Sequence, residues 1–192
     1  ARGMISAVLS AQLPSGQIPI SFSPYSTRSH RTQPPILAWG VYQLMQTCPD
    51  AEWLGALLEP LRKYLKWFEH HRMLDGLFGW VEDNGALGSV CDESGMDNSP
   101  RFSGGKSLQA IDLCCYMAQE YQAMAKLDPK GDWSKKAAGL KQKILNEFWD
   151  DRLGFFCDRD PEIGKTTGIQ AVTGFLPLIL GDLPKFQLDA LK

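Results

Sequence analysis

The sequence lacks the features that would direct it to a membrane or to nucleic acid. Its longest apolar runs, such as residues 175–180, are far too short to cross a bilayer. Its first residues have neither the long apolar core nor the cleavage site of a signal peptide. A net charge of −2 gives no electrostatic attraction to nucleic acid or to an anionic membrane. We therefore expect neither as a partner.

The sequence is also poor in the residues that usually hold metals or act as nucleophiles. It has three histidines, and none is expected beside a cysteine. The cysteines are odd in number and have neither disulfide nor zinc-finger spacing, which favours small buried side chains in a reducing, cytoplasmic compartment. These five cysteines are Cys48, Cys91, Cys114, Cys115 and Cys157.

Strand-like alternation of apolar and polar residues is missing over any useful length. Apolar residues instead recur at three- and four-residue spacing, which predicts amphipathic helices. Pro60 is expected to kink or divide one of them, and a short hairpin is expected around Phe155 and Phe156. The class is all-α, as a toroid or solenoid of helical hairpins, and no fixed repeat supports a repeat family. The predicted helices are 1–13, 36–47, 51–71, 107–127, 133–149 and a short one within 169–180.

Residues 92–102 are the most polar stretch between two of these helices. They hold three carboxylates, an amide, a guanidinium and the helix breakers Gly95 and Pro100. Such a segment is poor for either helix or strand, so it predicts a loop with side chains aimed into a shared space. A loop of this kind, held by a rigid scaffold, is a common place for function.

The chemistry of this loop fits glycoside hydrolysis. Glu93 and Asp97 lie four positions apart, and clustered carboxylates repel each other, so one can keep its proton near neutral pH. A protonated carboxyl beside the leaving oxygen and an ionised one opposite are what the reaction needs. Other polar and aromatic side chains are candidates to contact sugar hydroxyls or to stack on a sugar face. These candidates are Asn98, Arg101, Arg28, Arg31, Gln33, Trp80 and Trp39.

Simpler interpretations remain open on the residues alone. Glu93 or Asp97 could cap a helix or pair with Arg101, and Arg31 could be a solvated loop charge. Trp80 could belong to the core rather than to a sugar platform. The oxygen-bearing side chains between 92 and 98 could hold a divalent ion, although their spacing does not match an EF-hand and no metal is expected.

The segment Glu-Ser-Gly-Met-Asp-Asn-Ser-Pro-Arg at 93–101 closely resembles the signature loop of the inverting α-glycosidases of glycoside hydrolase family 63. The trehalase family has a related loop. Arg-Thr-Gln-Pro-Pro at 31–35 resembles a segment of the same clan. Further similarity lies in 75–80, 108–116 with Asp112, 148–160 and 175–178, so the resemblance runs to about residue 184.

The resemblance implies an (α/α)6 toroid and a single displacement with inversion of the anomeric carbon. It gives Asp97 the role of general acid, and it gives Arg31 and Gln33 the role of sugar contacts. The backbone at Gly95 is expected near the sugar. Glu93, Asn98 and Arg101 are expected to contact or position the substrate. No cofactor is implied, the expected partner is a carbohydrate, and the sequence gives no signal for an oligomeric state.

One departure from the family pattern concerns the general base. The family places it on a glutamate late in the barrel, and Glu162 does not match that context. The chain also does not begin with methionine. We therefore expect residues 1–192 to be a partial catalytic domain without the C-terminal half of the barrel, and of little activity in isolation. The alternative is a non-catalytic carbohydrate-binding or helical interaction module that keeps the polar loop.

Overall fold

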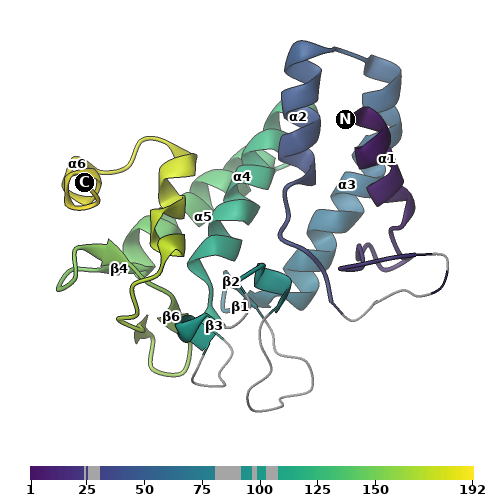
Figure 1. Ribbon diagram of the computed structural model, residues 1–192. Helices are drawn as coiled ribbons and strands as arrows, with labels where there is room; N and C mark the ends of the chain where they lie inside the picture. The colour runs from purple at the N-terminus through teal and green to yellow at the C-terminus, as the bar shows by residue number, and fades with distance from the viewer. Residues whose placement is uncertain (24, 26–30, 81–91, 97–98, 103–107) are drawn as a thin grey trace.

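The computed structural model describes residues 1–23, 25, 31–80, 92–96, 99–102 and 108–192 of the chain (Figure 1). The α-helices and 3-10 helices together hold more than half of the described residues, which confirms the predicted all-α class. No helix in the described ranges is long and apolar enough to cross a membrane. The α-helices are α1 (Arg2–Ser10), α2 (Leu37–Thr47), α3 (Ala51–His71), α4 (Ile111–Leu127), α5 (Trp133–Glu147) and α6 (Lys185–Ala190).

The helices begin and end close to where the sequence predicts. Asp50 caps α3 by accepting a hydrogen bond from the backbone N–H of Trp53 at 3.0 Å. The expectation that Pro60 divides this helix is wrong, because α3 runs through it without a break. Three 3-10 helices complete the helical part: η1 (Asp92–Ser94), η2 (Pro100–Phe102) and η3 (Val172–Leu180).

Short antiparallel strands join the helices, and only the hairpin was expected from the sequence. Strands of two to four residues are too short to show an alternation that periodicity can detect. The five-stranded sheet runs in the order β1 (Met73–Leu74), β2 (Leu77–Trp80), β3 (Leu108–Gln109), β6 (Arg159–Asp160) and β7 (Lys165–Thr166). The predicted hairpin is β4 (Trp149–Asp150) with β5 (Phe155–Phe156).

The strands explain two of the boundaries that the sequence placed differently. Leu108 pairs with Trp80 in the sheet, so α4 begins at Ile111 instead of near residue 107. Trp149 pairs with Phe156, so α5 ends at Glu147. At Gly79 the strands approach so closely that a Cβ would lie 2.2 Å from the backbone oxygen of Leu108, which requires glycine there.

Helix α4 lies at the centre of the packing. It contacts α5, α2 and η3, while the hairpins α2–α3 and α4–α5 lie side by side (Figure 1). Leu113, Met117 and Met124 on α4 are fully buried in one hydrophobic core. Each such side chain stabilises the fold by roughly 1.5–3 kcal/mol. A helix held on several sides gives the polar residues at its N-terminus a fixed position.

Candidate functional site

The described parts of the polar loop 92–102 include the turns η1 and η2, and η2 lies at the N-terminal end of α4. Asp97 and Asn98 fall between these two turns and lie outside the described residues, as does Arg28, so their roles stay predictions. Both flanks of the pair are described, and each flank is fixed by a buried charged side chain.

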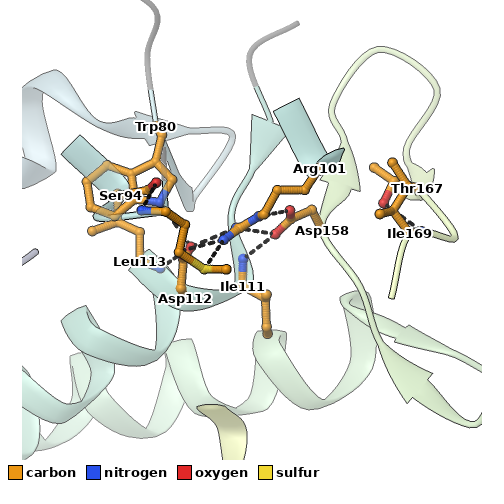
Figure 2. A network of polar contacts seen from close by, with 10 residues as sticks. Trp80, Ser94, Arg101, Ile111, Asp112, Leu113, Asp158, Thr167 and Ile169 are labelled. Carbon is orange, nitrogen blue, oxygen red and sulfur yellow. Dashed lines mark hydrogen bonds and ion pairs between the residues drawn. The ribbon is translucent and has the colours of Figure 1, made fainter. Parts of the chain in front are cut away.

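Arg101 of η2 is the centre of the first cluster. Its guanidinium donates to both oxygens of Asp112, at 2.6 and 2.9 Å, and to both oxygens of Asp158, at 2.6 and 2.7 Å (Figure 2). The Arg101 side chain is 1% exposed. Two bidentate pairs on one guanidinium fix its plane as well as its position.

Helix α4 helps to hold the two carboxylates of this cluster. Asp158 accepts a hydrogen bond from the backbone N–H of Ile111 at 3.0 Å, and Asp112 accepts one from Leu113 at 2.8 Å. Both N–H groups belong to the first turn, where the helix end carries partial positive charge. Asp158 therefore caps α4 from a distant part of the chain.

The pKa values of Arg101 and Asp158 are both shifted in this cluster. Burial lowers the pKa of Arg101, but the hydrogen bonds and negative charges of Asp112 and Asp158 outweigh that effect and keep its pKa above the usual value. Burial raises the pKa of Asp158, although the adjacent guanidinium opposes that shift. The guanidinium thus stays charged and holds the loop to α4.

Trp80 was predicted to be either a sugar platform or a core residue. The structure places it at 1% exposure, and its indole N–H donates to Asp112 at 3.0 Å. Figure 2 shows this ring beside the Arg101 cluster. The enclosed ring leaves no free face for stacking, so the core interpretation describes Trp80 and the platform interpretation does not.

Glu93 of η1 is the centre of the second cluster. Its carboxylate accepts from Arg72, with Nε to Oε2 at 2.9 Å and Nη2 to Oε1 at 2.6 Å. Oε1 also accepts from the backbone N–H of Thr32 at 2.9 Å. Arg72 ends α3 and lies over the ring of Trp67, with 4.7 Å to the ring centroid. The alternative that Glu93 pairs with Arg101 is wrong, since each has other partners.

Glu93 therefore joins the polar loop to the segment that carries Arg31 and Gln33. Arg31 is half-buried, and its carbonyl accepts from the backbone N–H of Ile20 at 2.9 Å. Gln33 is exposed, and its Nε2 donates to the carbonyl of Ile20 at 3.1 Å. The predicted sugar contacts at 31 and 33 thus lie on either side of Thr32, which is fully buried.

Gly95 lies between the two clusters in a left-handed conformation, with φ at 69°. No atom of the described residues lies within 4 Å of the place where a Cβ would be. The backbone conformation and not crowding therefore favours glycine there. Met96 follows, and its sulfur lies 3.9 Å from Nη1 of Arg101.

The structure gives the polar atoms of Glu93, Arg101 and Trp80 to protein partners. Glu93 and Arg101 were expected to contact or position the substrate, and Trp80 to be a sugar platform or a core residue. Arg72, Asp112 and Asp158 complete the clusters, and the sequence analysis assigned none of them to the site. The available signal was weak: an acidic residue in the first turn of a helix, and an arginine at the end of another. Among the described residues, no three side chains gather in a way that could hold a metal ion.

The paired helices define the fold of this chain as part of an (α/α)6 toroid. The model of the mannosylglycerate hydrolase MGH1-like glycoside hydrolase domain matches residues 1–192, so the chain belongs to that family.

Three known proteins show the extent of the similarity. An uncharacterized protein of Borreliella burgdorferi is 26% identical over 154 residues, which are 78% of this chain and 30% of that protein. A mannosylglycerate hydrolase from Thermus thermophilus, solved with Tris and D-glycerate, is 16% identical with a TM-score of 0.82, covering 99% of this chain and 64% of that one. Neutral trehalase from Saccharomyces cerevisiae is 21% identical with a TM-score of 0.74, covering 99% and 48%. The two structures establish the fold, and the chain spans less than two thirds of each of the three proteins.

Proposed function

We propose that this chain supplies the general-acid side of an inverting α-glycosidase site, with Asp97 as the proton donor. One observation carries the proposal: Glu93 and Arg101, four positions before and four after Asp97, are each anchored by buried charged hydrogen bonds. A loop pinned on both sides of one carboxylate is suited to present that carboxylate in a fixed place.

The energetics of the anchors support a positioning role. Burying charged groups costs several kcal/mol each, and the gain in such pairs often only offsets that cost. The two clusters are therefore better explained by a need to hold Glu93 and Arg101 in position than by a gain in the stability of the fold. General acids require a separation of about 2.6–3.2 Å from the atom that they protonate. The anchors fix Glu93 and Arg101 on either side of the proposed acid.

We propose small α-glycosides as substrates, with α-glucosides and α-mannosyl or α-glucosyl glycerate foremost. The family description and the D-glycerate and glucose complexes of the Thermus thermophilus enzyme support this class. Arg31 and Gln33, tied to the loop through Glu93, are the proposed sugar contacts, together with Asn98 and the backbone at Gly95. Glu93, Arg101 and Trp80 hold this arrangement without touching the sugar.

We further propose that the general base is provided by residues outside these 192, because none of the glutamates here matches the family's base motif. The assay therefore uses the complete protein, with this chain alone as a second sample. The chain alone is expected to show little or no hydrolysis.

The test is an NMR assay of glycoside hydrolysis that resolves the anomers of the first product. Wild-type protein is expected to release the β-anomer from an α-glycoside, and Asp97→Asn is expected to lose at least about a hundredfold in kcat, as for a missing general acid. Asp75→Asn makes the same chemical change in an exposed turn with φ at 51°, which asparagine accepts, and should be fully active. An α-anomer as first product, or an active Asp97→Asn variant, would refute the mechanism.

The alternative is a carbohydrate-binding module without turnover. It predicts that the complete protein binds the same glycosides but hydrolyses none of them. The same assay, run beside a binding measurement, therefore separates the two.

A further inference from the structure

A cavity of about 510 Å³ lies beside the segment that carries Gln33, between that segment, α3 and α4. Its volume is in the range of about 300–1,000 Å³ that small-molecule sites occupy. Its walls are largely apolar, with Ile18, Ile20 and Phe22 among them, and all the described residues that line it are uncharged. Gln33, from the segment ahead of α2, and Tyr116, from α4, are two of its polar lining residues.

Tyr116 lies on α4 between two residues that make buried hydrogen bonds, Asp112 and Glu120. Asp112, Tyr116 and Glu120 follow one another at four-residue spacing, which places them on one face of the helix. Asp112 binds Arg101, while Glu120 accepts hydrogen bonds from the backbone N–H groups of Ala38 and Trp39 at 2.8 Å each. Tyr116 thus lies between the anchor of the polar loop and the anchor of the start of α2.

Two polar atoms of this cavity, the Tyr116 hydroxyl and the Gln33 Oε1, are available to a ligand. Tyr116 is half-buried, and its hydroxyl neither donates a hydrogen bond to a described residue nor accepts one from it. Gln33 uses Nε2 on the carbonyl of Ile20, which leaves its Oε1 as an acceptor in the described part of the chain. Burial and the negative charge of Asp112 raise the pKa of Tyr116, so the phenol keeps its proton and can donate.

We infer that Tyr116 and Gln33 form a neutral subsite for a pyranose ring, with the phenol donating to a sugar hydroxyl and the Gln33 Oε1 accepting from one. An apolar wall with a few neutral polar atoms matches a sugar ring, which has apolar C–H faces and hydroxyl edges. The cavity has no lysine or arginine in its described lining, so it does not match the carboxylate of a glycerate. The inference deepens the proposed function, because it assigns the sugar end of the substrate to this cavity.

The test is binding of methyl α-D-glucopyranoside, methyl α-D-mannopyranoside and D-glycerate to the complete protein, measured by NMR titration. At least one glycoside is expected to bind saturably, and Tyr116→Phe is expected to weaken it about fivefold, the effect of one net hydrogen bond. Tyr42→Phe is the matched control, because Tyr42 is equally half-buried but lines a different hollow between α2 and α4. It should bind as wild type does.

A second readout does not depend on the variant. Tyrosine labelled with ¹³C at Cζ gives one signal for each tyrosine, and phenylalanine variants assign those of Tyr116, Tyr42 and Tyr121. The glycoside should shift the Tyr116 signal and leave those of Tyr42 and Tyr121 in place, and D-glycerate should shift none of the three.

The inference is overturned if neither glycoside binds, if Tyr116→Phe stays within twofold of wild type, or if D-glycerate moves the Tyr116 signal. These outcomes are independent of the hydrolysis assay. An active Asp97→Asn variant would refute the proposed acid and leave the proposed subsite untouched. An inactive Asp97→Asn variant, together with a Tyr116 signal that no glycoside shifts, would support the acid and refute the subsite.

Discussion

The carboxylate of Glu93 binds the backbone N–H of Thr32 at 2.9 Å while both its oxygens bind the guanidinium of Arg72. This one side chain connects the end of α3, the segment of Arg31 and Gln33, and the loop that continues to Asp97. The proposed sugar contacts and the proposed acid therefore share an anchor, and loss of that anchor should disturb both.

Glu93→Gln is expected to lower the free energy of unfolding by about 3 kcal/mol, because it leaves the buried Arg72 guanidinium without its counter-charge. The measurement is urea unfolding at neutral pH. Glu59→Gln removes an exposed pair with Arg62 at 3.6 Å and should cost less than about 1 kcal/mol. Equal losses in the two variants would show that Glu93 is no more important for stability than a surface residue.

Arg101→Lys is expected to cost at least about 2 kcal/mol although it keeps the charge. A lysine cannot reproduce the two bidentate pairs with Asp112 and Asp158, and it leaves buried carboxylate oxygens unsatisfied. Arg152→Lys is the control, since Arg152 is 82% exposed and pairs with Asp150 at 3.2 Å. Its thermal midpoint should match that of wild type. A stable Arg101→Lys variant would mean that the cluster needs only a positive charge.

The helices could be predicted from sequence because each one shows its own apolar face. Spacing at three and four residues placed α2 and α3 almost to the residue. The five-stranded sheet could not be predicted, since strands such as Leu108–Gln109 gain their pairing from partners far along the chain. Pairing of that kind leaves no local pattern.

The candidate site, too, could be predicted only in part from the sequence. The loop composition identified Glu93 and Arg101, but their partners Arg72 and Asp158 lie 21 and 57 positions away. Trp80 fitted two interpretations, because an indole has both an apolar body and a polar tip. Only its burial against Asp112 decides between them.

Gly95→Ala is expected to destabilise the protein by about 1 kcal/mol, the cost of a left-handed conformation for a residue with a Cβ. Among the described residues nothing crowds Gly95, so the expected cost is conformational. Gly55→Ala, inside α3 with open space around it, should instead stabilise by up to about 1 kcal/mol. Opposite signs in denaturant unfolding are the expected result, and two changes of the same sign would contradict it.

Glu120 gives the fold a pH dependence near neutrality. This carboxylate is fully buried under the first turn of α2, and burial raises its pKa to about 7, although hydrogen bonds from backbone N–H groups of α2 oppose the shift. Its ordinary value is 4.5, so the folded state holds a proton that the unfolded state has released between about pH 4.5 and pH 7. The stability contribution of this proton is complete below that window and is lost as the pH rises through it.

Wild-type protein is therefore expected to lose up to about 3 kcal/mol of stability from Glu120 between pH 5 and pH 8. Glu120→Gln cannot titrate, so the difference between the two unfolding profiles should show this slope alone. The variant should also start less stable, because an amide nitrogen cannot accept the second backbone N–H. Glu52→Gln, exposed in the first turn of α3, should follow the wild-type profile. A Glu120→Gln profile parallel to that of wild type would show that the carboxylate is ionised across the whole range, held by the N-terminus of α2.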